Sequence, residues 1–156
     1  GVSARWTSSA GERMGRESML LRGQVFETDS VSRIGKDGML ESVAVRGFTP
    51  NGDAAESFVI SGRKASWKSP VDGASVAYDA PAEYVAFGGP MELTAELIEA
   101  LLAAPDQSLA LLPGGRARAE LLTTASVPKL QPAANATTTG KHQGGARVIV
   151  IDTAIR

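Results

Sequence analysis

The residues that could do chemistry are few in this chain of 156 residues. It contains no cysteine and one histidine, His142, in the sequence TTGKHQGG. A lone histidine lacks the partners that chemistry requires, because zinc sites use three or four protein ligands and no G-x-S-x-G nucleophile motif accompanies it. We therefore expect His142 to be a solvated loop residue. We also expect no catalytic residue, no cofactor-binding residue and no metal site in this chain.

Two further patterns have structural explanations. Four aspartates could pair for acid–base chemistry, namely Asp29, Asp72, Asp79 and Asp152. Three of them lie in or next to predicted turns, and aspartate is favoured in turns because its side chain bonds to nearby backbone. The sequence LLPGGRA could bind an anion through its backbone beside Arg116. A proline followed by two glycines also defines a tight turn, and we favour the turn.

A set of apolar side chains could line a ligand cavity. The candidate lining residues are Trp6, Phe58, Trp67, Tyr84, Leu97 and Leu101. A curved antiparallel sheet covered by one helix is a common setting for such a cavity. The same residues would equally form an ordinary core, and aromatic side chains alone do not separate the two interpretations.

Composition excludes several classes of protein. The 16 Lys and Arg residues against 17 Asp and Glu give a net charge of −1, whereas nucleic-acid binding usually needs a clustered basic excess. Hydrophobic residues make up 43% of the chain, which argues against global disorder. No run approaches the roughly 20 apolar residues that span a bilayer. We therefore expect neither a nucleic-acid partner nor a transmembrane segment.

The first 90 residues predict short strands joined by tight turns. The segment VSARW, from Val2, alternates apolar and polar residues, which is typical of a half-buried strand. Asp37-Gly38 and Asn51-Gly52 are strong hairpin signals, because glycine accepts the positive φ of these turns. Turn signals recur roughly every 8 to 12 residues, as in antiparallel all-β proteins.

The pattern then changes to that of a helix. Large apolar residues fall on one helical face, at Leu93, Leu97, Ile98, Leu101 and Leu102. Thr94 could cap the start of this helix, and Pro105 would end it. The sequence therefore predicts a mainly β fold: a curved antiparallel sheet or half-barrel of about seven to nine strands, with a helix at about 93–104 packed on its concave face.

The composition changes again near the end of the chain. Residues 125–146 contain two prolines, three consecutive threonines and the glycine-rich sequence GKHQGG, which predict a linker or mobile loop. The run RVIVID that follows is typical of a buried strand. We therefore divide the chain into a β-rich domain at 1–124, a linker at 125–146 and a terminal strand at 147–156. That strand either completes the sheet or opens a further domain.

Several motifs, in their order along the chain, resemble a known family. They are KDGMLESVAVRG, SFVISGRKASWKSPVDGASV, AEYVAFGGP and LIEALLAAPDQSLALLPGG, within residues 3–122. This region is similar to the β-rich N-terminal region that precedes the catalytic barrel in some bacterial secreted amidohydrolases. The resemblance implies a non-catalytic accessory module, periplasmic or secreted, whose partner is a hydrolase catalytic domain or subunit. The barrel of that family uses a His-x-His pair, further histidines and an aspartate, and no position of this chain corresponds to them.

Two other functions fit the same sequence. A sheet with a covering helix and several aromatic residues would suit a periplasmic protein that binds an apolar small molecule, such as a lipid carrier. An independent hydrolase would have to use His142 together with a serine and an aspartate, without a recognisable nucleophile motif.

Overall fold

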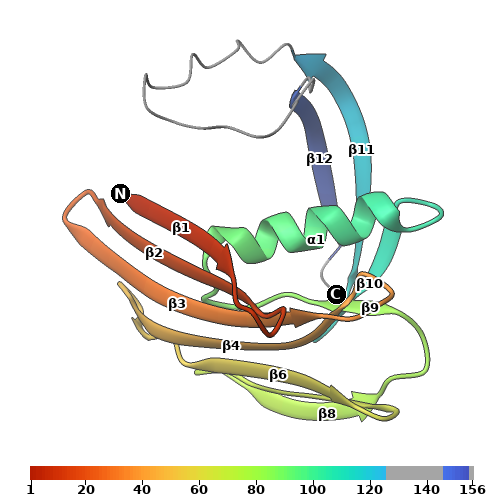
Figure 1. Ribbon diagram of the computed structural model, residues 1–156, viewed down its shortest axis with the longest axis horizontal. Helices are drawn as coiled ribbons and strands as arrows, with labels where there is room; N and C mark the ends of the chain where they lie inside the picture. Colours follow the sequence, from red (N-terminus) through yellow and green to blue (C-terminus); the bar gives the residue numbers. More distant parts are fainter. Residues whose placement is uncertain (126–145, 155–156) are drawn as a thin grey trace.

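A computed structural model describes residues 1–125 and 146–154, with side chains described for residues 1–120. This part of the chain forms two β-sheets and one helix (Figure 1). The predicted linker at 125–146 lies outside the described residues except for its two end positions. His142 lies outside them as well.

The larger sheet is antiparallel and curved, and it forms one layer of the molecule (Figure 1). Its strands are β1 (Val2–Thr7), β2 (Arg13–Leu21), β3 (Gln24–Ile34), β4 (Leu40–Thr49), β5 (Gly52–Asp53), β6 (Glu56–Ser61), β7 (Lys64–Lys68) and β8 (Gly73–Ala77). Their order is β1-β2-β3-β4-β6-β7-β8, and β5 pairs with β4. The sheet does not close into a barrel, so the predicted curved antiparallel sheet or half-barrel with one packed helix is confirmed.

The predicted hairpin turns form where the sequence placed them. Between β3 and β4, Gly38 takes a φ of 82°, and the Asp37 carboxylate accepts a hydrogen bond from the Met39 amide at 3.1 Å. At the turn from β4 into β5, Gly52, the first residue of β5, takes a φ of 114°. Both values lie in the region that glycine accepts without strain, which explains why these two turns could be recognised from sequence.

The smaller sheet explains why an otherwise antiparallel protein contains a helix. Its strands are β9 (Ala82–Tyr84), β10 (Ser108–Leu112), β11 (Arg116–Ala125) and β12 (Ala146–Ala154), in the order β12-β11-β10-β9. β9 and β10 are parallel, and parallel neighbours need a long crossover connection. The helix α1 (Met91–Ala103) is that crossover. The terminal strand β12 pairs antiparallel with β11.

The helix begins earlier than predicted. Its N-cap is Pro90, which has no capping side chain, so Thr94 lies inside the helix and the prediction that it caps the helix was wrong. The larger sheet supplies an acceptor instead, because Glu17 on β2 accepts a hydrogen bond from the Met91 amide at 3.1 Å. The helix ends at Ala103, shortly before Pro105, as predicted.

Two apolar clusters lie between these elements. The sheet-side cluster comprises Leu40, Val43, Val45, Phe58, Ala65, Trp67 and Tyr84. The helix-side cluster comprises Met39, Leu97, Ala100, Leu101, Leu109, Leu111, Ala117 and Ala119. The helix therefore packs its apolar stripe mainly on the smaller sheet, while it lies over the concave side of the larger one (Figure 1).

Candidate functional site

The aromatic residues of the predicted cavity form a packed core. The Phe58 and Tyr84 rings are stacked, with centroids 4.5 Å apart and planes 4° apart. The Trp67 ring lies 6.3 Å from that of Tyr84 at an interplanar angle of 39°. All three side chains are buried in the sheet-side cluster, so they fill the concave face of the larger sheet with their own rings.

The other three predicted residues lie elsewhere. Leu97 and Leu101 belong to the helix-side cluster. Trp6 shares a face of the sheet with its cross-strand partner Met14, and it is 45% exposed. Arg5, the residue before Trp6 on β1, points to the opposite face and forms an ion pair with Glu99 of the helix. Trp6 therefore lies on the outer, convex face, away from the core aromatics.

The enclosed space next to Tyr84 is small. A cavity of about 50 Å³ lies between β9 and the start of α1, lined in part by Tyr84, Leu93 and Leu97. Binding pockets for small molecules usually measure roughly 300–1,000 Å³. A depression of about 610 Å³ also exists, but it is open to solvent and its lining comes entirely from residues 67–75 around the β7–β8 turn.

A buried glutamate fixes the segment that follows β9. Glu56 on β6 accepts a hydrogen bond from the Tyr84 hydroxyl. Its carboxylate also accepts hydrogen bonds from the Phe87 amide at 2.9 Å and from the Gly88 amide at 3.2 Å. Buried charge is tolerated when it is hydrogen-bonded, so Glu56 joins the larger sheet to the loop that leads into α1.

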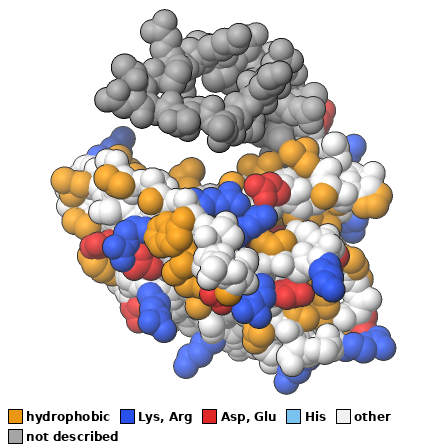
Figure 2. Space-filling model, in the orientation of Figure 1, with side chains coloured by type: hydrophobic (Ala, Val, Ile, Leu, Met, Phe, Trp, Pro, Cys, Tyr) orange, Lys and Arg blue, Asp and Glu red, His pale blue; other side chains and the backbone are white. Residues whose placement is uncertain are grey.

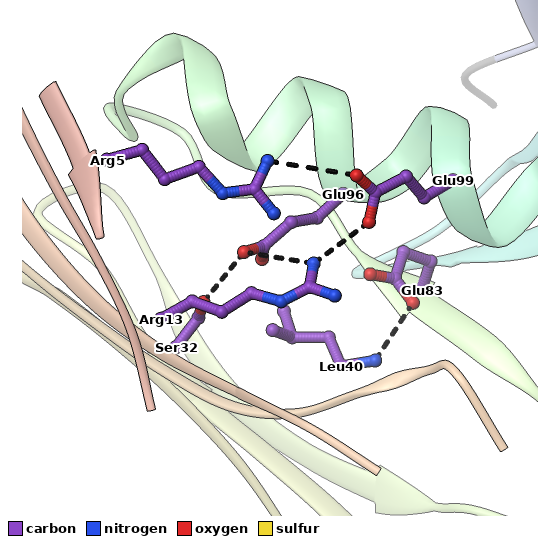
Figure 3. A network of polar contacts seen from close by, with 7 residues as sticks. All are labelled: Arg5, Arg13, Ser32, Leu40, Glu83, Glu96 and Glu99. Carbon is purple, nitrogen blue, oxygen red and sulfur yellow. Dashed lines mark hydrogen bonds and ion pairs between the residues drawn. The ribbon is translucent and has the colours of Figure 1, made fainter. Parts of the chain in front are cut away.

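A second group of polar side chains lies between α1 and β1–β3 (Figure 3). Cross-strand pairing places Arg5, Gly15 and Ser30 on one face of the sheet, and Arg13 and Ser32 on the same face. The helix presents glutamates to that face at the spacing i, i+4 and i+7. We call this group the polar seam, and it comprises Arg5, Arg13, Gly15, Ser30, Ser32, Glu83, Glu92, Glu96 and Glu99.

Ion pairs and hydrogen bonds cross the polar seam (Figure 3). Arg13 lies 3.0 Å from a Glu99 oxygen and 3.7 Å from a Glu96 oxygen. Arg5 lies 3.7 Å from the other Glu99 oxygen. The Ser32 hydroxyl donates a hydrogen bond to Glu96 at 2.9 Å. The helix is thus held to this part of the larger sheet by charged and polar side chains.

Several carboxylate oxygens of the seam are buried without a donor. Glu92 is 9% exposed, and neither of its oxygens has a hydrogen-bond partner, nor does Glu96 Oε2. The Glu92 carboxylate lies directly against Gly15, where a Cβ atom would overlap it. Gly15 therefore provides the room that Glu92 occupies.

Burial also shifts the acid–base behaviour of the seam. Burial raises the pKa of Glu83 to about 7, the hydrogen bond from the Leu40 amide opposes this, and the charges of Glu96 and Asp37 add to it. Burial likewise raises the pKa of Glu96, opposed by Ser32, Arg13 and Arg5. At least one buried carboxyl of this protein thus changes its charge near neutral pH.

This shift predicts a pH-dependent stability. Because the pKa of Glu83 is raised from 4.5 to about 7 on folding, its stabilising contribution is complete below the unfolded value and is lost as pH rises through about 7. As pH rises from 4.5 to about 7, we expect ionisation of Glu83 to lower the free energy of unfolding by about 3 kcal/mol. Urea denaturation at several pH values measures it. In Glu83→Gln this component should vanish, whereas exposed Glu41→Gln should retain it.

The polar seam was missed by the sequence analysis, although a signal was present. Glu92, Glu96 and Glu99 fall on one helical face, and Ser30 and Ser32 alternate along a strand. An acidic residue near the start of a helix is favoured by the helix dipole, and this effect alone accounts for Glu96 in the sequence. Their burial depends on the approach of a strand face that carries two arginines, and sequence spacing does not reveal that approach.

The remaining predicted residues have structural roles where they are described. Asp29 and Asp79 form exposed ion pairs with Arg16 and Arg63. Asp72 accepts a hydrogen bond from Ser69 at the β7–β8 turn. The side chain of Asp152 lies outside the described side chains.

The Pro113-Gly114-Gly115 sequence forms the turn between β10 and β11, as predicted. The Leu111 amide donates a hydrogen bond to the Gly115 carbonyl at 3.0 Å, and Gly115 takes a φ of 103°. Arg116 binds the Ser108 hydroxyl at 2.7 Å, so its side chain spans the two strands beside the turn.

The surface of the described residues carries no dominant charge on the side shown in Figure 2, where basic, acidic and apolar side chains are interspersed. Within the same part of the chain, no helix is long and apolar enough to cross a membrane. Nor does that part group three or more His, Cys, Asp or Glu side chains in a way that could hold a metal ion.

Comparison of the chain with family models, with curated proteins and with solved structures found no match.

Proposed function

We propose that this chain is a non-catalytic β-rich module that works with an amidohydrolase-type metal-dependent hydrolase, as a domain or subunit beside its catalytic barrel. The order of the sequence motifs motivates the proposal. The structural observation that supports it best is an apolar row on the outer face of the larger sheet.

This apolar row crosses four strands. Trp6, Met14, Val31 and Ala44 are successive cross-strand partners on β1, β2, β3 and β4. Because α1 and the smaller sheet lie on the inner face, no described element covers these side chains, and all four are exposed or half-buried.

Charged pairs border the apolar row on two sides. Arg16 pairs with Asp29 at 2.6 Å, and Arg33 pairs with Glu12 at 3.2 Å. An apolar strip with a polar border is the usual composition of a protein interface. We assign the row to contact with the hydrolase.

The filled interior supports this function over that of a ligand carrier. The concave face is occupied by stacked aromatic rings and by α1, and the enclosed cavity measures only about 50 Å³. A lipid carrier would need several times that volume.

A genetic test addresses the association itself. Reading the coding DNA beyond codon 156, together with the adjacent genes, should reveal a metal-dependent hydrolase with a His-x-His strand, in the same frame or next to it. A frame that stops with no such hydrolase encoded nearby would count against the proposal.

A binding test then addresses the apolar row. Ala44 lies in the row, and Ala77 lies on the same outer face at the far edge strand β8. We expect Ala44→Lys to weaken binding to the isolated catalytic domain by about tenfold or more, because it buries a charge in an apolar contact. Ala77→Lys should bind like the wild type, as measured by isothermal titration calorimetry. Equal affinities for both variants would exclude the row as the contact.

A further inference from the structure

We propose that β8, the last strand of the larger sheet, pairs antiparallel with β8 of a second copy of this chain, so that two larger sheets join into one. This inference does not depend on the function proposed above, because the apolar row lies on β1–β4, at the other end of the strand order. It rests on the backbone groups that β8 leaves free and on the side chains that it carries.

β8 is an open edge of the larger sheet. It stands last in the strand order and pairs with β7 on one side, and all of its residues are exposed. It lies along the lower rim of the sheet in Figure 1, with no described element beyond it. Such an edge presents a row of unpaired N–H and C=O groups, to which another strand can add.

β8 lacks the features that usually protect an edge strand. Charged side chains, proline, bulges and inward-pointing charges keep other strands away from a sheet edge. The sequence of β8 is GASVA, without charge or proline, and its register with β7 is continuous. At the other end of the strand order, β1 carries an inward-facing Arg5 that pairs with Glu99 of α1. The two terminal strands of this sheet are therefore not equally open to a partner.

Hydrogen bonds just outside the two ends of β8 show which of its backbone groups are used. The Tyr78 amide donates a hydrogen bond to the Arg63 carbonyl at 2.8 Å, and the Ser69 amide donates one to the Asp72 carbonyl at 2.7 Å. Residues 72 and 78 therefore turn their backbone groups toward the preceding strand, β7.

The free groups follow from the alternation of an antiparallel ladder. Hydrogen-bonded and non-hydrogen-bonded residues alternate along such a strand, and the β7–β8 register has no break. The even-numbered residues between 72 and 78 consequently bond to β7. The N–H and C=O groups of Gly73, Ser75 and Ala77 point to the open edge.

A two-fold axis at Ser75 matches these groups to one another. In an antiparallel pair centred there, Ser75 lies opposite Ser75 of the second copy, and Gly73 lies opposite Ala77 of the second copy. Both members of each pair point their backbone groups outward, and a hydrogen-bonded pair exchanges two N–H···O bonds. This register therefore satisfies every outward group of both strands, as a self-complementary two-fold interface requires. For this reason we assign the edge to a second copy.

The side chains of β8 fit the same register. Val76 is 37% exposed and lies opposite Ala65 of β7; on its other side it would meet Ala74 of the second copy. On the outer face the Ser75 hydroxyl lies 2.9 Å from that of Ser66, and serine hydroxyls on paired strands contribute such bonds. Because β8 carries no charge, the pairing sets no like charges opposite each other, which would weaken it.

Sedimentation equilibrium of the full chain tests the association. Between about 1 µM and about 1 mM, the mean mass should rise from 16.2 kDa toward twice that value. A chain that stayed at the monomer mass up to about 1 mM would overturn the proposal.

Ser75→Pro removes the central outward amide from both copies. Proline is tolerated on an edge strand where its missing N–H faces solvent, so the fold should persist, as circular dichroism can check. Two hydrogen bonds of the central pair are lost, and we expect the dissociation constant to rise about tenfold or more. Ser75→Ala is the control, because it removes only the hydroxyl and should still dimerise. A dimer that Ser75→Pro leaves unchanged would contradict the pairing.

Cross-linking tests the register without proline. The chain contains no cysteine, so Ser75→Cys places one thiol per copy at the axis. Cα atoms of a hydrogen-bonded pair are about 5.5 Å apart, within the range of about 4.4–6.8 Å for a disulfide. Ala77→Cys is the matched control on the same face of the strand, because its counterpart lies about 13 Å further along.

Mild oxidation should link the Ser75→Cys variant into a covalent dimer about tenfold or more faster than the Ala77→Cys variant. Equal rates for the two variants, or no covalent dimer from either, would refute this pairing whatever the effect of Ser75→Pro on folding.

Discussion

Leu101→Asp should unfold the protein at 25 °C. Leu101 is fully buried at 0% exposure in the helix-side cluster, and an aspartate there would be a buried charge among leucine and alanine side chains. Such a change costs more than about 4 kcal/mol, combining lost apolar contact with an unpaired charge. This is comparable to the whole stability of many domains of this size.

The neighbouring residue is the control for this substitution. Leu102 is 39% exposed on the same helix, so Leu102→Asp makes the same chemical change outside the core and should cost much less. Circular dichroism and tryptophan fluorescence during thermal unfolding would compare the two variants. If Leu101→Asp melted within a few degrees of Leu102→Asp, the helix could not be packed on the smaller sheet as described.

Glu56→Ala should produce the second large loss of stability. It removes the acceptor for the Tyr84 hydroxyl and for the Phe87 and Gly88 amides. Each buried donor left without an acceptor costs about 1–3 kcal/mol, so we expect a total loss of about 3–5 kcal/mol in the free energy of unfolding, as measured by urea denaturation.

Two further variants show where this loss originates. Tyr84→Phe removes one of the three donors and should cost only about 1–2 kcal/mol. Glu41→Ala changes an exposed glutamate of β4 and should have little effect. If Glu56→Ala were no more destabilising than Glu41→Ala, the segment after β9 would not depend on the buried carboxylate.

The parts of the fold that could be predicted are those with local causes. Asp37-Gly38 forms a turn because glycine accepts a φ that other residues resist. Leu97 and Leu101 marked the buried stripe of α1 because their spacing matches the helical period. Such signals depend only on neighbouring residues, so one sequence contains them.

The parts that could not be predicted depend on distant residues. The free Met91 amide at the start of the helix donates a hydrogen bond to Glu17, 74 positions earlier in the chain. The helix therefore begins before Thr94, the residue that the local sequence favoured as its cap. β9 is three residues long and pairs in parallel with β10 across the helix, a pairing that strand length and composition did not indicate.

The candidate site shows the same limit. The alternation of Val2, Ala4 and Trp6 predicts a strand, but it does not say which face of the sheet meets the core. Trp6 was therefore predicted to line the cavity, although it lies on the outer face of the sheet. Conversely, Glu92 and Glu96 are buried only because Arg13 and Gly15 arrive from a strand far away in sequence.

The division of the two sheets along the chain has a consequence for synthesis. All strands of the larger sheet lie within residues 2–77, and all strands of the smaller sheet lie within 82–154. Phe58 and Trp67 are therefore synthesised before Tyr84 and Leu112, which pack against them. Leu112 follows Trp67 by 45 positions, which corresponds to about 2–9 s at roughly 5–20 residues per second. A sheet that formed during these seconds would expose the apolar side chains of the sheet-side cluster to chaperones and to other nascent chains. The half that later lies under α1, lined by Arg5, Arg13, Gly15, Ser30 and Ser32, would expose little apolar surface.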